Sequence, residues 1–309
     1  MKKIKIQDVI MNFNLALNLR DLGHLDFIDQ NGILNLAKIK GQKRLNNDLF
    51  NFLATNFKTI KIDRIYFGNE FCEFLTPNIN IFKKIIELLG KRNLALTYLT
   101  GYLTLNNEEI IKENLNYLSN FEEKNIEVVL NDYGLLNYFV AKKLNLKPVM
   151  GRLLLKIKNN PYDKKEIKPD LPENLEVNLD DIINNQKSFY NSLPVLDFFE
   201  QHLGKDVSLE TDKINLVQNL NKDILPRINL HLPWSYLTCG RNCLIANWQS
   251  KKFSFPIKKC QKECLSYYYL FAKDKSLIQE GNAVYKNNLG FLFDLNILEG
   301  INRLVLTLF

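Results

Sequence analysis

The chain has 309 residues, of which 46% are hydrophobic, so it can bury a sizeable core within one domain. Its formal net charge of +7 comes from 41 basic and 34 acidic side chains, and the short basic runs at residues 38–44, 164–168 and 251–259 are interpreted as solvated lysines. No apolar run approaches the roughly twenty residues that cross a bilayer, and the lysine-rich start lacks an apolar stretch, so we expect a cytoplasmic protein without a membrane span or an export signal.

From about residue 60 to residue 152, short β-branched or aromatic runs alternate with longer segments whose apolar residues recur at helical spacing. The expected strands lie at residues 62–67, 94–99, 126–130 and 148–157. The expected helices between them lie at residues 79–89, 108–121 and 133–144. Because the strands are nearly all apolar, they should be buried on both faces, as in a parallel sheet.

The following stretch, residues 158–178, is polar and rich in proline, and it predicts a long loop or insertion. The alternation then resumes, with helices expected at 191–202 and 213–219 and strands at 207–210 and 227–232. Residues 276–287 predict a strand-turn-strand unit, and 301–309 form a β-forming run. Residues 1–309 therefore predict a single α/β domain of repeated strand-helix units with a C-terminal β extension.

Four of the five cysteines, Cys239, Cys243, Cys260 and Cys264, lie within 26 positions. Converging thiolates in a reducing compartment select iron-sulfur clusters or zinc. The spacing leaves three interpretations open: a cluster, a zinc site, or unrelated buried thiols. Zinc is weakened because three residues, rather than two, separate each close pair. Cys72 follows the expected strand 62–67, where barrels place site loops, although a buried core cysteine is the alternative.

Most of the chain, from about residue 60 onward, resembles a known family. Residues 65–72, Ile-Tyr-Phe-Gly-Asn-Glu-Phe-Cys, are similar to the strand-Gly-Glu-x-x-Cys element of the collagenase-like peptidase family U-32, especially its UbiV-like branch of anaerobic ubiquinone-biosynthesis iron-sulfur proteins. The later segments follow that family's order of Leu-Pro-x-x-Tyr, a cysteine and Cys-x-x-x-Cys, at residues 232–236, 240–243 and 260–264. Weaker matches fall in the same order at residues 131–134, 148–151 and 282–287.

The chain departs from the family pattern in three places. Asn69 and then Glu70 follow the strand glycine, where the family usually has Glu directly. The first sixty residues match poorly, and residues 158–178 have no clear counterpart. The substrate could therefore differ from that of the family.

The resemblance implies a partly or fully closed, TIM-barrel-like (β/α)-barrel. It also implies a [4Fe-4S] cluster bound by Cys72, Cys243, Cys260 and Cys264, with Cys239 outside the ligand set unless it replaces Cys243. The activity that it implies is oxygen-independent hydroxylation of a quinone precursor, by a UbiV-like subunit in a heterodimer with a UbiU-like family member.

There are two alternatives. The protein could hydroxylate an RNA base, or it could be non-catalytic and hold a structural or sensory cluster. Proteolysis is least favoured, because thiolates that bind iron cannot act as nucleophiles.

Three further residues are candidates for a catalytic role. Arg241, next to the expected ligands, could neutralise a cluster or bind an acidic substrate, or it could bridge loop carbonyls. Asp132 and Glu210 lie at or near expected strand ends, where a barrel site would lie, and so does Arg152. For Asp132, Arg152 and Glu210, the alternative role is to cap a helix or to hold a loop in place.

Histidine and aromatic residues are weaker candidates. Of His24, His202 and His231, only His231 lies near the expected site, so we do not expect histidine catalysis. Trp234, Tyr236 and the tyrosines at 267–269 are expected in an aromatic core, with shielding of a cluster or of a flat ligand as the alternative.

Overall fold

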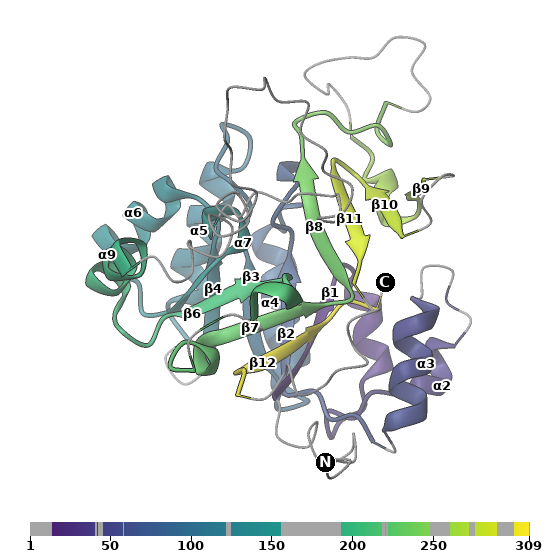
Figure 1. Cartoon of the computed structure of the whole chain (residues 1–309). Coiled ribbons are helices and arrows are strands. Elements are labelled where there is room, and N and C mark those ends of the chain that lie inside the picture. Colours follow the sequence, from purple (N-terminus) through teal and green to yellow (C-terminus); the bar gives the residue numbers. More distant parts are fainter. Residues whose placement is uncertain are drawn as a thin grey trace, which may run out of the picture.

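The computed structural model describes residues 14–40, 42, 46–57, 59–121, 125–155, 193–217, 220, 222–247, 260–271, 276–288 and 300–308. Eight parallel strands form a closed barrel in the order β1-β12-β7-β6-β5-β4-β3-β2 (Figure 1). The strands are β1 (Asn14–Leu19), β2 (Arg64–Gly68), β3 (Ala95–Leu99), β4 (Ile126–Leu130), β5 (Lys147–Met150), β6 (Ser208–Thr211), β7 (Ile228–Leu232) and β12 (Arg303–Leu306). The predicted (β/α)-barrel-like fold is therefore confirmed, and the barrel is complete.

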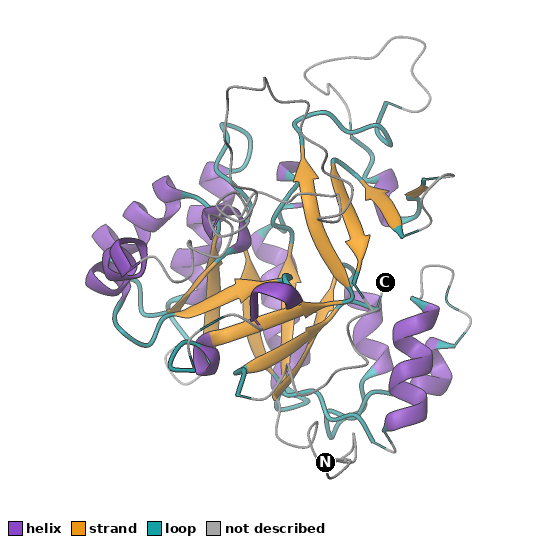
Figure 2. Ribbon diagram, in the orientation of Figure 1, coloured by secondary structure: helices purple, strands orange, loops and turns teal. Residues whose placement is uncertain are grey.

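Helices surround the barrel strands (Figure 2). The longer ones are α3 (Asn47–Asn56), α4 (Ile79–Gly90), α5 (Glu108–Leu118), α6 (Tyr133–Lys142) and α9 (Leu193–Leu203). The shorter ones are α2 (Leu36–Ile39), α7 (Arg152–Leu155), α10 (Ile214–Val217) and the 3-10 turns η1 (Leu22–Phe27), η2 (Glu73–Leu75), η3 (Leu225–Arg227) and η4 (Glu263–Leu265). In the part of the chain described above, none of the helices has the length and apolar character needed to cross a membrane.

Helix α4 illustrates why these segments fold as expected. The side chain of Asn78 accepts a hydrogen bond from the backbone N–H of Ile81 and so caps the first turn. The apolar residues Phe82, Ile85, Ile86 and Leu89 recur at helical spacing and are buried. They cover the outward side chains of the neighbouring strands, and Phe82 packs edge-on against Phe67 of β2.

The barrel strands alternate between an outer and an inner face. Outward side chains such as Ile65 and Phe67 join the large core under the helices, whereas inward Tyr66 packs with Leu99 and Val129. The remaining interior is unusually polar and contains charged side chains as well as apolar ones. Buried inside the barrel wall are Arg64, Thr97, Glu127, Glu210, Asn229, His231 and Arg303.

A second, antiparallel sheet follows the order β8-β11-β10-β9. Its strands are β8 (Trp234–Cys239), β9 (Tyr269–Leu270), β10 (Leu277–Glu280) and β11 (Ala283–Asn287). It lies against the barrel through Phe71, from the loop after β2, which packs with Ile278, Ala283 and Tyr285 of the small sheet. This sheet is the predicted C-terminal β extension, and β10 and β11 form the predicted strand-turn-strand unit.

Three sequence predictions need correction or lie outside the described residues. The strand expected at 148–157 ends at Met150, and α7 begins directly after Gly151. A side chain could not replace Gly151, because a Cβ there would lie 2.0 Å from Oδ1 of Asn131. The loop predicted at 158–178 lies outside the described residues. The first sixty residues, for which no element was predicted, contribute β1, η1, α2 and α3.

Candidate functional site

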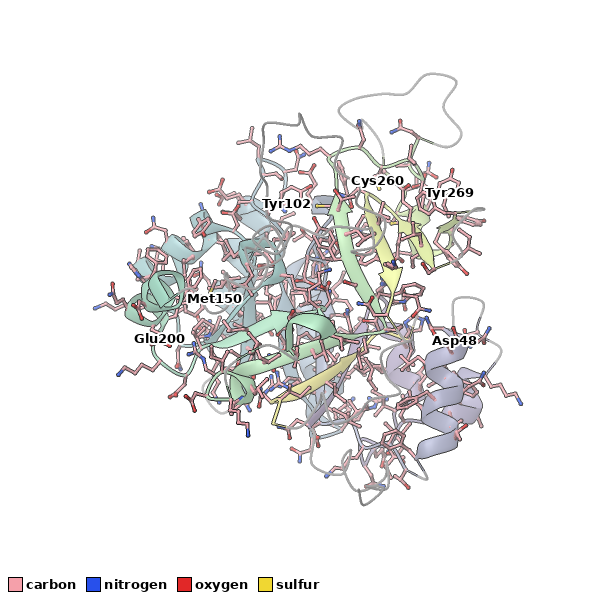
Figure 3. The ribbon with its side chains drawn as sticks, in the orientation of Figure 1. Asp48, Tyr102, Met150, Glu200, Cys260 and Tyr269 are labelled. Atoms are coloured by element: carbon pink, nitrogen blue, oxygen red, sulfur yellow. The ribbon has the colours of Figure 1, made fainter. Side chains whose placement is uncertain are left out.

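The cysteines come to one end of the barrel from separate parts of the chain. Cys72 lies in the loop after β2, Cys243 lies after β8, and Cys260 and Cys264 precede β9. Figure 3 shows Cys260 and Tyr269 at the small-sheet end of the molecule, away from Glu200 on α9. The carboxyl end of barrel strands is where barrel enzymes build their sites.

The position of Cys72 is set by hydrogen bonds within its loop. Oδ1 of Asn69 accepts hydrogen bonds from the backbone N–H groups of Phe71, at 2.9 Å, and Cys72, at 2.7 Å. This local turn satisfies backbone donors that would otherwise be buried without partners. Asn69, which departs from the family pattern, is therefore the residue that shapes the cysteine loop.

The turn between β10 and β11 joins the Cys72 loop to the other cysteine-bearing segment. Nδ2 of Asn282 donates to the backbone oxygens of Phe71 and of Gly240, each at 2.6 Å. One side chain therefore fixes the loop that carries Cys72 relative to the end of β8, just before Cys243.

Cys243 and Cys264 share an apolar environment. Both are buried, at 5% and 4% exposure, and they cluster with Ile245, Leu75 and Tyr269. The Sγ of Cys264 also lies close to the β10–β11 turn, 3.6 Å from where a Cβ on Gly281 would be. Exclusion of water around two thiols suits a buried metal centre as well as a simple core.

The thiols of Cys72 and Cys243 have raised pKa values, and other cysteine thiols contribute to both shifts. Burial raises the pKa of Cys72 to about 12, and the thiols of Cys264 and Cys260 add to this rise. Burial also raises the pKa of Cys243, with a contribution from Cys260. Cys72 and Cys264 line one small cavity, Cys243 and Cys264 share one apolar cluster, and all four cysteines expected as ligands are free thiols.

The described side chains do not form a metal-binding arrangement in this structure. Within the ranges given for the structure, no three His, Cys, Asp or Glu side chains converge as ligands of one metal ion would. The four expected cysteine ligands fit an iron-sulfur cluster by their chemistry, because four thiolates are the usual ligands of such clusters. They also lie at the same end of the barrel.

Cys239 has a different environment from the other four. It ends β8, and its Sγ accepts a hydrogen bond from the hydroxyl of Tyr236 at 3.3 Å. Burial raises the pKa of the Cys239 thiol, and this hydrogen bond opposes the rise. Cys239 also packs against the apolar cluster of Phe71 and Tyr285, rather than that of Cys243 and Cys264.

A buried ionic network lies across the carboxyl end of the barrel. Arg152 forms ion pairs with Glu70, after β2, and with Asp212, after β6, the latter at 3.1 Å. Asp212 also accepts from the backbone N–H of Tyr236 at 2.7 Å and pairs with Lys213. The guanidinium of Arg152 therefore joins the loops after two barrel strands and, through Asp212, the small sheet.

Charge neutralisation explains the pKa values in this network. Burial would lower the pKa of Arg152, but the carboxylates of Glu70 and Asp212 outweigh it and raise that pKa. Burial would raise the pKa of Asp212, but Lys213 and Arg152 outweigh it and lower that pKa. Both groups are therefore charged, and the network can hold its geometry at neutral pH.

A second polar network fills the barrel interior. Glu210 accepts from the hydroxyl of Tyr66 at 2.9 Å and from Nδ2 of Asn229 at 2.9 Å, and its other oxygen lies 2.5 Å from Nε2 of His231. Arg303 bonds the same tyrosine hydroxyl and pairs with Glu127. These groups are buried inside the barrel and pair with one another.

The structure assigns structural contacts to two of the three catalytic candidates. Asp132 caps α6 through hydrogen bonds from the N–H groups of Gly134 and Leu135, which is the alternative role weighed for it. Glu210 lies in the interior network. Arg241 is exposed. Burial raises the pKa of Tyr102 to about 12, and the charge of Arg241 opposes this rise.

The remaining histidine and aromatic candidates lie in different environments. His24 stacks on Phe27, and Nδ1 of exposed His202 lies 2.7 Å from a backbone oxygen of α9. Tyr236 stacks on Phe71, with ring centroids 4.4 Å apart, and Trp234 packs on the same cluster, as expected for core aromatics. Tyr267 and Tyr268 are instead exposed, at 65% and 37%.

Several site residues were not found by sequence reasoning. Arg20 and Asp212 belong to no motif, although each lies directly after a strand, and Asn282 is only the start of the weak family match at 282–287. The position of Arg20 after a first β-strand was the available signal, but β1 itself was not predicted.

Comparisons with known proteins do not assign the chain to a family. No family model matches it, and no solved structure matches it. The chain is 25% identical over 162 residues to an uncharacterized 341.7 kDa protein in the psbD-psbC intergenic region of Chlamydomonas reinhardtii. That match covers 50% of this chain and 5% of the relative, so the chain spans a small fraction of the curated relative's length.

Proposed function

We propose that this chain is an iron-sulfur protein of the U-32 type, with a [4Fe-4S] cluster bound by Cys72, Cys243, Cys260 and Cys264. One observation carries the proposal: Cys72 and Cys264 line one small cavity, and Cys243 and Cys264 share one apolar cluster, at one end of a closed barrel. A core that needed only small apolar residues would have no reason to gather four thiols there.

The surroundings of these thiols support a cluster. Cys243 and Cys264 lie in an apolar cluster, which keeps water from the sulfur atoms. The raised pKa values of Cys72 and Cys243 favour protonated thiols without metal, so cluster binding would release protons from these two residues, as it does in other thiolate sites. Convergence of the four sulfur atoms on the cluster is part of the proposal.

The barrel end beside these cysteines is suited to a reaction, and the function that we propose is oxygen-independent hydroxylation. The cluster would supply one-electron chemistry, while the loops after β1, β2 and β8 would position the substrate. A quinone precursor is the proposed substrate, and a second, UbiU-like family member is the proposed partner in a heterodimer. Hydroxylation of an RNA base is the alternative within the same chemistry.

Anaerobic purification tests the cluster. Iron, sulfide and zinc analysis, with visible and paramagnetic resonance spectra, should give about four irons and four sulfides per chain. Cys72→Ala should lose the cluster, whereas Cys239→Ala should retain it, because Cys239 lies with a different apolar group. Zinc without sulfide after reconstitution would contradict the proposal.

The substrate is tested in the source cells. Deletion of the gene should remove a quinone product under anaerobic growth, and the protein should co-purify with a family partner. Loss of an RNA base modification, with the quinones unchanged, would favour the RNA alternative. A protein whose fold alone depends on the cysteines, with no product lost, would instead have a structural cluster.

A further inference from the structure

A cavity of about 220 Å³ opens at the carboxyl ends of β1 and β2, beside the cysteines. Its walls come from three segments: the β1–η1 turn, the β2–α4 loop and the stretch between Cys260 and β9. The apolar lining residues are Leu22, Phe67, Leu75, Pro77, Ile81 and Leu265. Polar groups lie among them, contributed by Arg20, Asp21, Asn69 and Lys262.

This cavity adjoins the thiols. A second, much smaller cavity of about 10 Å³ is lined by Cys72 and Cys264, and it shares Arg20, Asn69 and Leu75 with the larger one. Arg20 forms an ion pair with Glu280, which also lines the smaller cavity. A ligand in the larger cavity would therefore lie close to the smaller cavity that Cys72 and Cys264 line.

The polar atoms at the larger cavity differ in whether they are already satisfied. Glu280 neutralises Arg20, and Oδ1 of Asp21 is held by the backbone N–H of Gly23. By contrast, the ammonium of exposed Lys262 and Nδ2 of Asn69 have no partner among the residues that the structure describes. Among the described lining residues, the cavity therefore offers the Lys262 ammonium, which is outside any described ion pair, and the amide donor of Asn69 beside apolar side chains.

The size of the cavity limits its ligand. An enclosed apolar cavity of about 150 Å³ holds one benzene ring, so about 220 Å³ admits a ring with a small substituent. Pockets of this composition fix the orientation of a ligand with a few polar groups and bind it mainly through apolar contact.

We propose that this cavity binds a small ring-shaped apolar molecule with one anionic group, which Lys262 and Asn69 bind through charge-assisted and amide hydrogen bonds. The assignment of this ligand as the substrate rests on the proposed function, because the cluster would be the reacting centre beside the ring. Lys262 lies between the proposed ligands Cys260 and Cys264, so ligand binding and cluster geometry share one segment.

Titration calorimetry on the anaerobically purified full chain tests the proposal, with benzoate as the probe and benzyl alcohol and benzylamine as neutral and cationic matches. Benzoate should bind most tightly, and Lys262→Gln should weaken its binding about tenfold. Lys147→Gln, at an exposed site at the opposite end of the barrel, is the matched control and should bind as the unchanged chain does.

Filling the cavity provides a second variant. Ile81 is half-buried on the first turn of α4, so Ile81→Trp, or the milder Ile81→Phe, should fold and abolish benzoate binding. Equal binding of the three probes, or benzoate binding that Lys262→Gln and both Ile81 variants leave unchanged, would overturn the proposal, and so would no binding at all.

Iron and sulfide analysis of the same samples separates the two proposals. Lysine-dependent benzoate binding to a chain without a cluster would contradict the proposed function and leave the binding site standing. A chain with the cluster intact that binds no benzoate would contradict the binding site alone.

Discussion

Arg152 and Glu70 form a buried ion pair that joins the start of α7 to the loop after β2. Nε of the guanidinium lies 3.3 Å from Oε1 of Glu70, and Nη2 contacts the other carboxylate oxygen. The side chains are only 8% and 2% exposed, so neither charge is solvated well enough to stand alone. The Glu70 backbone leads directly to Cys72, and this pair therefore supports the cysteine loop.

Replacing Arg152 should destabilise the protein strongly. Arg152→Met leaves the buried carboxylates of Glu70 and Asp212 without their shared cation, which should lower the free energy of unfolding by about 3–5 kcal/mol. Urea unfolding measures the loss. Lys112→Met, which removes an ion pair with Glu108 on the surface of α5, is the control and should cost less than about 1 kcal/mol. Equal losses would show that the buried pair has no special role.

Asp212 should make stability fall at acid pH. Burial alone would raise the pKa of folded Asp212. The charges of Lys213 and Arg152 outweigh this effect and hold that pKa below its ordinary value near 3.9. Its stabilising contribution is therefore complete above the unfolded pKa and is lost as pH falls through the folded pKa. Asp212→Asn should be less stable at pH 7, and its deficit should shrink below about pH 4.

Urea midpoints between pH 7 and pH 3 test this dependence. Glu109→Gln, at a side chain that is 88% exposed on α5, should keep the acid dependence of the unchanged protein. A deficit for Asp212→Asn that stays constant with pH would mean that the folded pKa of Asp212 is not depressed.

Gly68, the last residue of β2, should not tolerate a side chain. Its φ of +127° is rare for other residues, and a Cβ would lie 2.2 Å from the backbone oxygen of Leu99. Strain of this kind alone costs about 1–3 kcal/mol, so Gly68→Ala should lose more than that range in urea unfolding.

Two other glycines separate strain from steric overlap. Gly204 also has a positive φ, +93°, but a Cβ there would meet no atom within 4 Å. Gly204→Ala should therefore show the cost of backbone strain alone. Gly240→Ala has an open contact at 3.7 Å and should be near neutral. A loss for Gly68→Ala no larger than that for Gly204→Ala would exclude the steric explanation.

Asn282 should position both cysteine segments. Asn282→Leu removes hydrogen bonds to the backbone oxygens of Phe71 and Gly240 and should cost about 1–3 kcal/mol for each oxygen left unpaired. Because the two segments then separate, we expect lower iron content after anaerobic purification.

The control for this variant is Asn116→Leu on the exposed face of α5, where the side chain bonds only the hydroxyl of Tyr138. It should leave both stability and iron content unchanged. Full iron content in folded Asn282→Leu would mean that Asn282 stabilises the turn without positioning the cysteines.

Local patterns predicted much of the barrel wall. The apolar runs that became β2, β3, β4 and β7 are buried on both faces, and α4 shows the helical spacing that was read from the sequence. Where the pattern misled, at residues 148–157, the run Arg-Leu-Leu-Leu after Gly151 is consistent with either a strand or a helix. In the folded chain this run forms α7, where the backbone N–H of Leu153 donates to Oδ1 of Asn131 and Arg152 pairs with Glu70.

Local patterns are enough to predict the strand-helix alternation, the strand-turn-strand extension and the spacing of the cysteines, because periodicity and residue chemistry act over a few neighbouring positions. The folded chain adds that β1 and β12 close the barrel, that Arg152 bridges Glu70 and Asp212, and that Asn282 joins two cysteine-bearing segments. These contacts join residues 42 to 289 positions apart, and such pairings depend on barrel closure rather than on any local signal.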